Sequence, residues 1–175
     1  MQQTIFTVGH SDLSFMRFIS HIQANNINHI IDIRSIPYSR HAPWSNKSRL
    51  SEILKPFRIR YTYLGHKLGG KKKSIENYTR QQGITPEKIY DDAIQVLLQL
   101  SMRDRLALLC SEGDPANCHR QHTVAQTLLK SGVKVLHILE DGSIIEAWKE
   151  DDLSEQLELF STDRDDNLPR NSPPV

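Results

Sequence analysis

Both cysteines of the chain, Cys110 and Cys118, lie in one short segment that runs directly into His119 and Arg120. Acidic residues lie between the two cysteines. Thiolates attack electrophiles, imidazoles and carboxylates transfer protons, and guanidinium groups bind phosphate. So many reactive groups in one segment predict a chemical function rather than a purely structural one.

The two thiols differ in their expected surroundings. Cys110 ends an apolar run that starts at Leu106, where a buried, inert cysteine is the alternative to a reactive one. Cys118 precedes a helical pattern, and a helix N-terminus lowers a thiol pKa, so Cys118 is the better candidate nucleophile. Seven residues separate the cysteines and no second pair exists, unlike the usual zinc spacing. We therefore expect no metal and no cofactor.

The other polar residues of the segment suit acid–base work. A carboxylate such as Glu112 beside His119 can transfer protons, or stabilise a sugar-like cation in a transition state. The alternative for Glu112 is a solvated loop charge. Arg120, at a helix start, can bind phosphate together with backbone N–H groups. Its alternative is an internal salt bridge to Glu112 or Asp114.

The pattern along the chain predicts the elements that position this segment. Short apolar runs predict strands at 4–8, 29–33, 59–63, 106–110 and 133–138. The intervening patterns predict helices that begin after Ser11 or Asp12, span 48–54, run from Pro86 to about Met102, and end before Gly132. Residues 65–73 read as a glycine and lysine loop. The prediction is a Rossmann-like three-layer α/β domain over 1–150, with a mainly parallel sheet of about five strands and helices on both faces.

Carboxyl ends of parallel strands meet at one edge of a sheet, where α/β proteins place their sites. His10 follows the first predicted strand, and Asp32 and Arg34 follow the second. We expect them to meet the 110–120 segment there, so His10 and Asp32 join the catalytic candidates. The alternative is that Asp32 caps backbone N–H groups and pairs with Arg34.

Glycine loops, hydroxyls and basic side chains bind phosphate well, although a lysine run is often only a solvated loop. Nearby aromatic residues such as Tyr38 and Trp44 could stack on bases. The expected phosphate- or substrate-binding residues are Ser11, Arg34, Ser39, Arg40, Gly69, Gly70, Lys71 and Arg120.

Composition bounds the class of protein. The chain has 175 residues, 38% hydrophobic and 25% charged, with a net charge of +1, so no global field favours nucleic acid or membrane. No apolar run is long enough to cross a membrane, and the N-terminus does not resemble a signal peptide. A cytoplasmic location with reduced cysteines is the expectation.

Four motifs in order resemble the bacterial family catalogued as domain of unknown function 488. They are Gly9-His10-Ser11, Asp32-x-Arg34-Ser35-x-Pro37-x-Ser39-Arg40, Leu68-Gly69-Gly70 and Cys110-x-Glu112-x5-Cys118-His119-Arg120. The resemblance covers about residues 4–142. It implies an α/β fold and a site built from the motif residues, but no settled reaction. The chain departs from the family at Lys71-Lys72, where members often carry arginine, which grips phosphate in a bidentate manner.

The order of the predicted elements is also similar, more weakly, to that of rhodanese-type sulfurtransferase domains. Those domains run from the cysteine directly into the helix through a compact loop. The loop after Cys110 is longer and carries acids, which argues against persulfide chemistry there.

Residues 151–175 form the expected C-terminal extension, with a disordered tail from Asp163. Within it, Gln156-Leu157-Glu158-Leu159-Phe160 looks like the pentapeptide that binds the bacterial sliding clamp. The alternative is an amphipathic turn that packs Leu153, Leu157 and Phe160 on the domain. A docking peptide would associate the protein with DNA replication or repair.

The leading hypothesis is an enzyme that processes a nucleic acid or nucleotide. Its pocket would bind phosphate and contain acid–base groups, and the reaction would be hydrolysis of a base–sugar bond. One alternative is a non-catalytic, DNA-associated binding module. The other is a rhodanese-like thiol enzyme that uses Cys110 or Cys118.

Overall fold

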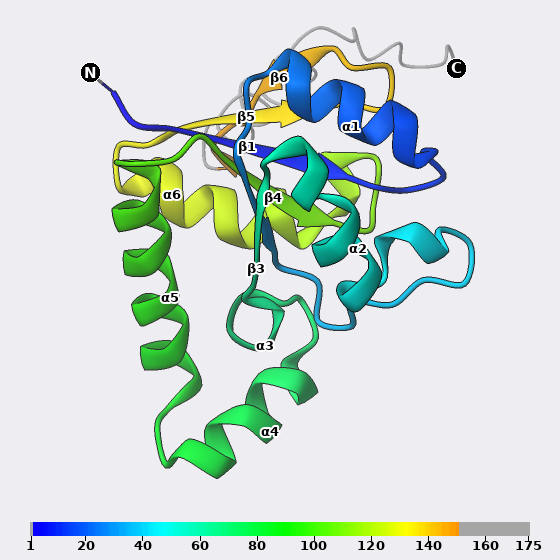
Figure 1. The fold of residues 1–175 in the computed structure, drawn as a ribbon. Helices are drawn as coiled ribbons and strands as arrows, with labels where there is room; N and C mark the ends of the chain where they lie inside the picture. The colour runs from blue at the N-terminus through cyan, green and yellow to red at the C-terminus, as the bar shows by residue number, and fades with distance from the viewer. Residues whose placement is uncertain (1, 151–175) are drawn as a thin grey trace, which may run out of the picture.

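A six-stranded sheet forms the centre of the computed structural model, which describes residues 2–150 except for the side chains at 72–74, 81 and 82. The strands lie in the order β3-β2-β4-β1-β5-β6 (Figure 1). Neighbouring strands are parallel except for β6, which runs antiparallel to β5. Their bounds are β1 Thr4–Gly9, β2 His29–Asp32, β3 Arg60–Tyr63, β4 Leu106–Cys110, β5 Lys134–Ile138 and β6 Ile144–Glu146.

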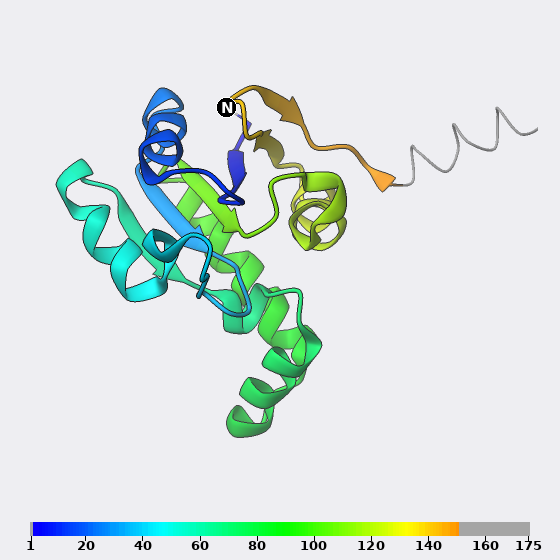
Figure 2. The same cartoon turned by 90° about the vertical axis from the view of Figure 1, so that its right-hand side faces the viewer.

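Helices cover both faces of this sheet (Figures 1 and 2). Phe18 and Leu50, from the helices α1 and α2, belong to the apolar cluster on one face, and Leu97 and Leu128, from α5 and α6, to the cluster on the other. The helices are α1 Phe15–Ala24, α2 Lys47–Ile53, α3 Gly65–Leu68, α4 Lys72–Gln82, α5 Pro86–Ser101 and α6 Gln126–Lys130. The predicted three-layer α/β fold is confirmed, with six strands rather than about five. The additional strand is β6, after the turn at Gly142.

The start of α1 differs from the prediction. Its N-cap is Ser14, whose Oγ accepts the N–H of Arg17 at 3.3 Å, rather than Ser11 or Asp12. Ser11 lies in the left-handed region at φ 36° and donates its own N–H to the carbonyl of Ser111 at 2.8 Å. Ser11 therefore ties the first strand's loop to the cysteine segment instead of capping a helix.

The predicted glycine and lysine loop is wrong for most of its length. Residues 65–68 form the short helix α3, Gly69 to Lys71 are a connection, and α4 begins at Lys72. In Figure 1 α4 projects away from the sheet beside α5. It ends at Gly83, whose φ of 66° is a conformation that glycine adopts without strain.

The segment leading into α6 begins as a π-helical turn over Arg120–Ala125. Such wide turns are rare and are frequent at functional sites. None of the helices in residues 2–150 is sufficiently long and apolar to cross a membrane. Residues 151–175, including Gln156–Phe160 and the predicted tail, lie outside the described part of the chain.

Candidate functional site

Three adjacent strands bring the predicted residues to the carboxyl edge of the sheet. β4 lies between β1 and β2, with Cys110 opposite Gly9. Beyond the strands, the N–H of His10 donates to the carbonyl of Cys110 at 3.0 Å, and the N–H of Ile33 donates to Leu109 at 3.1 Å. These bonds fix the loops after the three strands against one another.

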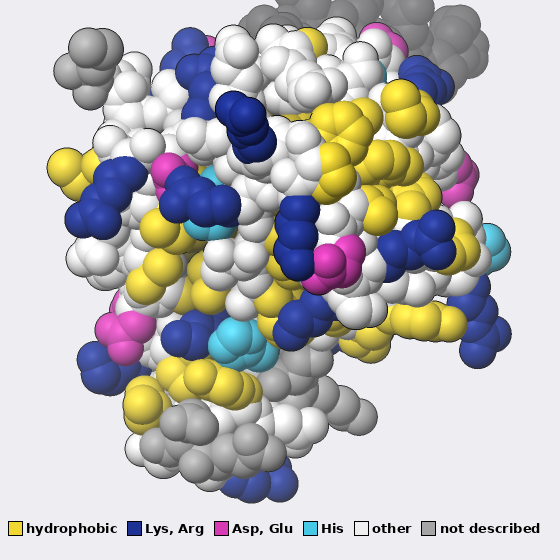
Figure 3. Space-filling model, viewed as in Figure 1, with side chains coloured by type: hydrophobic (Ala, Val, Ile, Leu, Met, Phe, Trp, Pro, Cys, Tyr) yellow, Lys and Arg dark blue, Asp and Glu magenta, His cyan; other side chains and the backbone are white. Residues whose placement is uncertain are grey.

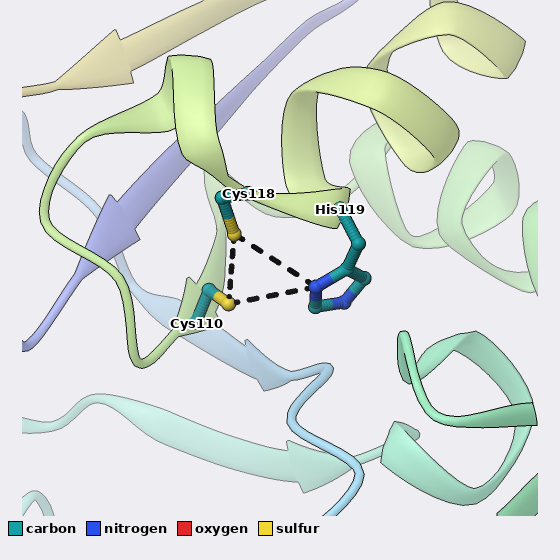
Figure 4. A group of neighbouring side chains, drawn as sticks. All are labelled: Cys110, Cys118 and His119. Carbon is teal, nitrogen blue, oxygen red and sulfur yellow. Dashed lines mark hydrogen bonds between the residues drawn. The ribbon is translucent and has the colours of Figure 1, made fainter.

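Cys110, Cys118 and His119 form a compact group, named here the thiol–imidazole cluster (Figure 4). The two sulfur atoms are 3.0 Å apart. The Nδ1 atom of His119 lies 3.7 Å from the sulfur of Cys110 and 3.8 Å from that of Cys118. A 3-10 turn over Pro115–Asn117 folds the chain back, so that residues distant in sequence meet here.

The hydrogen bonds of the cluster separate the roles of the two thiols. The S–H of Cys118 donates to Cys110, and this bond, with further help from His119 and the backbone N–H of Glu112, lowers the pKa of Cys110 against the effect of burial. The same bond and burial raise the pKa of Cys118. Sequence reasoning favoured Cys118 because of a helix N-terminus. Cys110 is instead the thiol that ionises more readily.

Arg120 holds the loop between the two cysteines. Its side chain is fully buried, and its Nη atoms donate to the carbonyls of Glu112 at 2.5 Å and Gly113 at 2.6 Å. A Cβ atom at Gly9 would overlap both the Glu112 carbonyl and this guanidinium, so glycine is required there. Within residues 2–150, Arg120 is therefore bound to backbone carbonyls rather than paired with a carboxylate.

Asp32 and Arg34 also bind each other. Arg34 donates to both carboxylate oxygens, at 2.9 and 2.6 Å, and to the Oγ and carbonyl of Ser45 at 3.1 and 2.7 Å. Tyr61 donates its O–H to Asp32 at 2.6 Å. Asp32 is wholly buried. This geometry matches the alternative in which Asp32 pairs with Arg34 and supports the fold. Asp32 is therefore not among the residues that can reach a substrate.

A cavity of about 400 Å³ opens beside the cluster. Its lining includes Cys110, Glu112, His119, Arg34, Gly70 and Lys71. Gly70 lies directly under the His119 ring, where a Cβ atom would approach the ring carbon Cγ to 3.0 Å. The cavity thus brings together five of the predicted side chains and one of the predicted glycines.

A second hollow of about 650 Å³ adjoins the first and shares Tyr38 with it. Tyr61 and Tyr63 line it, and the Nζ atom of Lys47 lies 4.3 Å from the centre of the Tyr63 ring. In the view of Figure 3, dark-blue lysine and arginine side chains predominate over acidic ones. The lining of this hollow thus combines aromatic rings with the positive charge of Lys47.

Several predicted residues lie away from the cavity lining. His10 is buried and its pKa is lowered by burial and by Arg34, while its Nδ1 lies 3.1 Å from the carbonyl of Ser11. Ser39 Oγ accepts the N–H of Ala42, and Arg40 is exposed. Gly69 is buried, and a side chain there would overlap Ser35.

Sequence reasoning did not single out Ser45 or Ser111. Ser45 completes the bonds of Arg34, and Ser111 lines the cavity and anchors the loop of Ser11. Ser111 directly follows a predicted strand, so its position at the carboxyl edge of the sheet could have been predicted. Ser45 ends a short 3-10 turn over Pro43–Ser45, and nothing in its local sequence pattern indicates a buried partner.

Among the residues that the structure describes, those of the thiol–imidazole cluster could hold a metal, since their ligand atoms lie within 4.8 Å of one another. The expectation of no metal relied on the seven-residue gap between the cysteines. Because the 3-10 turn closes that gap in space, the spacing argument loses its force.

Fold and site together define an α/β protein with a thiol–imidazole cluster at the carboxyl edge of a mainly parallel sheet. The family model described as "Domain of unknown function DUF488" matches residues 14–127, more than half of the chain, so the chain belongs to this family. The match includes the cluster and the Asp32–Arg34 pair but not His10. No curated protein matches the chain, and no solved structure does.

Proposed function

We propose that this protein is an enzyme that acts on a nucleotide or nucleic acid in the 400 Å³ cavity. The observation that supports the proposal is the common lining formed by Glu112, His119, Arg34 and Lys71. The volume falls within the range of small-molecule sites, roughly 300–1,000 Å³. Carboxylate, imidazole and positive charge thus face one space of suitable size.

The roles follow from exposure and bonding. Glu112 is exposed to the cavity and is the general acid–base group, with His119 beside it. Lys71 attracts the phosphate, and the backbone near Gly70 allows close approach. Arg34, whose charge is compensated by Asp32, forms part of the cavity wall. Arg120 keeps the loop in place instead of binding the phosphate.

The neighbouring hollow suits the base of such a substrate. Tyr38 is exposed and lies between the two spaces, and stacking on an aromatic ring stabilises a bound base by roughly 1–3 kcal/mol. The reaction proposed is hydrolysis of a base–sugar bond, in which water adds to the sugar carbon and the base leaves with a proton.

The test compares Glu112→Gln with Asp114→Asn. Asp114 is in the same loop, but it caps the 3-10 turn through Ala116 and Asn117. Release of free base from a panel of nucleosides, nucleotides and short DNA is measured by chromatography. Glu112→Gln should slow release by roughly 10²-fold or more, and Asp114→Asn should not. Tight binding of the panel without any release would favour a non-catalytic binding module instead.

A second candidate function is a thiol enzyme with Cys110 as nucleophile. The specific observation in its favour is that Cys110 accepts the Cys118 S–H at 3.0 Å while lining the cavity. Iodoacetamide should then label Cys110 well before Cys118, as read by peptide mass spectrometry, and should abolish activity. An enzyme that depends on Glu112 alone would keep its activity in Cys110→Ala.

We also propose recruitment to DNA through Gln156, Leu157, Leu159 and Phe160, in a cytoplasmic protein. Leu and Phe side chains of an extended peptide can fill an apolar groove of a sliding clamp. A pull-down with purified clamp should lose binding in Phe160→Ala and retain it in Ser161→Ala. Retention in both variants would eliminate the recruitment proposal.

A further inference from the structure

The three ligand atoms of the thiol–imidazole cluster form a nearly symmetric triangle. Nδ1 of His119 lies almost equally far from both sulfurs, at 3.7 and 3.8 Å, and the sulfurs are 3.0 Å apart. A hydrogen bond normally selects one partner at a short distance. Here one imidazole nitrogen is shared almost evenly between two sulfurs, at the long end of hydrogen-bond distances to sulfur, and a common central partner would produce the same even sharing.

The dimensions of the triangle suit a small soft cation. With bond lengths of about 2.3 Å to sulfur and about 2.0 Å to nitrogen, a tetrahedral zinc site has sulfur–nitrogen separations of about 3.5 Å and a sulfur–sulfur separation of about 3.8 Å. The sulfur–nitrogen distances already match closely. Only the two sulfurs must move apart, by roughly 0.8 Å, which small rotations of the two side chains can supply.

The surrounding backbone is arranged to hold both sulfurs in place. The N–H of Arg120 lies 3.5 Å from the sulfur of Cys118, and the N–H of Glu112 faces that of Cys110. The buried guanidinium of Arg120 fixes the loop between the two cysteines through the carbonyls of Glu112 and Gly113. Bonds of this outer kind orient metal ligands and are as important as the ligands themselves.

One side of the triangle is open. Cys110 and His119 line the cavity, together with Glu112. Three protein ligands and one open position are the arrangement of catalytic rather than structural zinc sites.

From this geometry we infer that Cys110, Cys118 and His119 bind one soft divalent cation, of the zinc type, with its fourth position directed into the cavity. The role of the ion in turnover rests on the proposed function: a water bound there would lie beside Glu112, which would take its proton. Binding itself does not depend on that function. A metal-bound Cys110 is no longer a free nucleophile, so this inference also opposes the thiol-enzyme candidate.

The test uses the full chain, reduced and freed of metal with a chelator, and Cd²⁺ as the probe. Thiolate-to-cadmium charge transfer gives an ultraviolet band, and the chain's only two cysteines are those of the cluster. One Cd²⁺ per chain should bind with a two-thiolate band. Cys118→Ser should halve the band or remove it, and His119→Ala should weaken binding roughly tenfold or more. Ser111→Ala, which changes the same cavity without removing a ligand, should bind as the wild type does.

Circular dichroism of each variant verifies that it is folded, and a second readout is independent of the variants. Zn²⁺ added to the wild-type protein should protect both thiols from iodoacetamide. No band at stoichiometric Cd²⁺, or rapid alkylation in the presence of Zn²⁺, would overturn the inference. Metal binding without hydrolysis of any nucleotide leaves the inference intact and defeats only the proposed function. Hydrolysis without metal binding would overturn the inference and leave the proposed function intact.

Discussion

Asp32 and Arg120 are the residues whose roles differ most from their chemical appearance. Both carry charges at the edge of the sheet where a site was expected, yet both are fully buried and bound to neighbouring groups. Asp32 holds Arg34 and Tyr61, and Arg120 holds two backbone carbonyls. A carbonyl acceptor has no signature in the sequence, because every residue carries one. The prediction could therefore place Arg120 but not identify its partners.

Asp32→Asn should destabilise the protein strongly. It removes the charge that compensates the buried guanidinium of Arg34, and breaking a buried ion pair on one side costs roughly 3–5 kcal/mol. Urea unfolding measures the change. Glu52→Gln breaks an exposed pair with Lys55 and should change the free energy of unfolding by less than about 1 kcal/mol. Equal effects of the two changes would show that the Asp32 pair contributes no more than a surface pair.

Arg120→Met should cost roughly 3 kcal/mol of stability, because it leaves the part-buried carbonyl groups of Glu112 and Gly113 without their guanidinium donors. Arg103→Met, at an exposed position, should stay within about 0.5 kcal/mol in the same unfolding experiment. A stable Arg120→Met variant would mean that water replaces the guanidinium and that the loop needs no clamp.

At the scale of elements, five of the six strands were predictable, whereas β6 and the helix α4 were not. Leu106 to Cys110 is a continuous apolar run, buried on both faces, and its strand has the predicted bounds. The α4 helix contains little apolar sequence, and it packs beside α3 and α5 rather than on the sheet. Ile75 and Tyr78 are the only apolar residues of α4, so its apolar stripe is too short to distinguish a helix from a polar loop.

Strand β5 contains a group that should make stability depend on pH. His137 is fully buried between Thr7 and Gln121, and burial, followed by the charge of Arg120, lowers its pKa to about 4. The unfolded chain titrates near 6.5, so the stabilisation is complete above about pH 6.5 and is lost as the pH falls toward 4.

Wild-type protein should therefore lose roughly 2 kcal/mol more than His137→Gln between pH 7 and pH 5, in urea unfolding. The pKa values of His10 and His29 are also lowered, but both proteins contain these residues, so their effects cancel in the difference. Parallel pH curves for the two proteins would contradict the assignment to His137.

At the scale of the molecule, the sequence predicted that the candidate residues meet at the carboxyl edge of the sheet, because strand ends in an α/β fold converge there, and the strand order brings them together at that edge. It could not place the contacts of the segment after β6. The carbonyl of Trp148 accepts from Gln121 at 2.7 Å and from Gln126 at 2.9 Å, and Glu150 lies 2.6 Å from Nδ1 of His122. The end of the predicted domain thus packs on the π-helical turn that follows His119 and on the start of α6.

A chain that ends at Glu150 should therefore unfold thermally within about 2 °C of the full chain, since it keeps these contacts. A chain that ends at Gly142 loses β6 and the bonds to Trp148, and its melting temperature should fall by more than about 5 °C. Calorimetry distinguishes the two. A large loss on removing 151–175 alone would show that the extension is part of the folded domain.

The burial of Arg120 makes tryptic cleavage at this residue a probe of whether the protein is folded. Trypsin cleaves after arginine, and the stretch Leu106–Arg120 contains no other site for it while containing both cysteines. In the folded chain the Arg120 side chain is wholly enclosed, so cleavage there must wait for local or global opening. A single tryptic peptide therefore records, in a cell extract, both the chemical state of every thiol in the protein and whether its fold was intact.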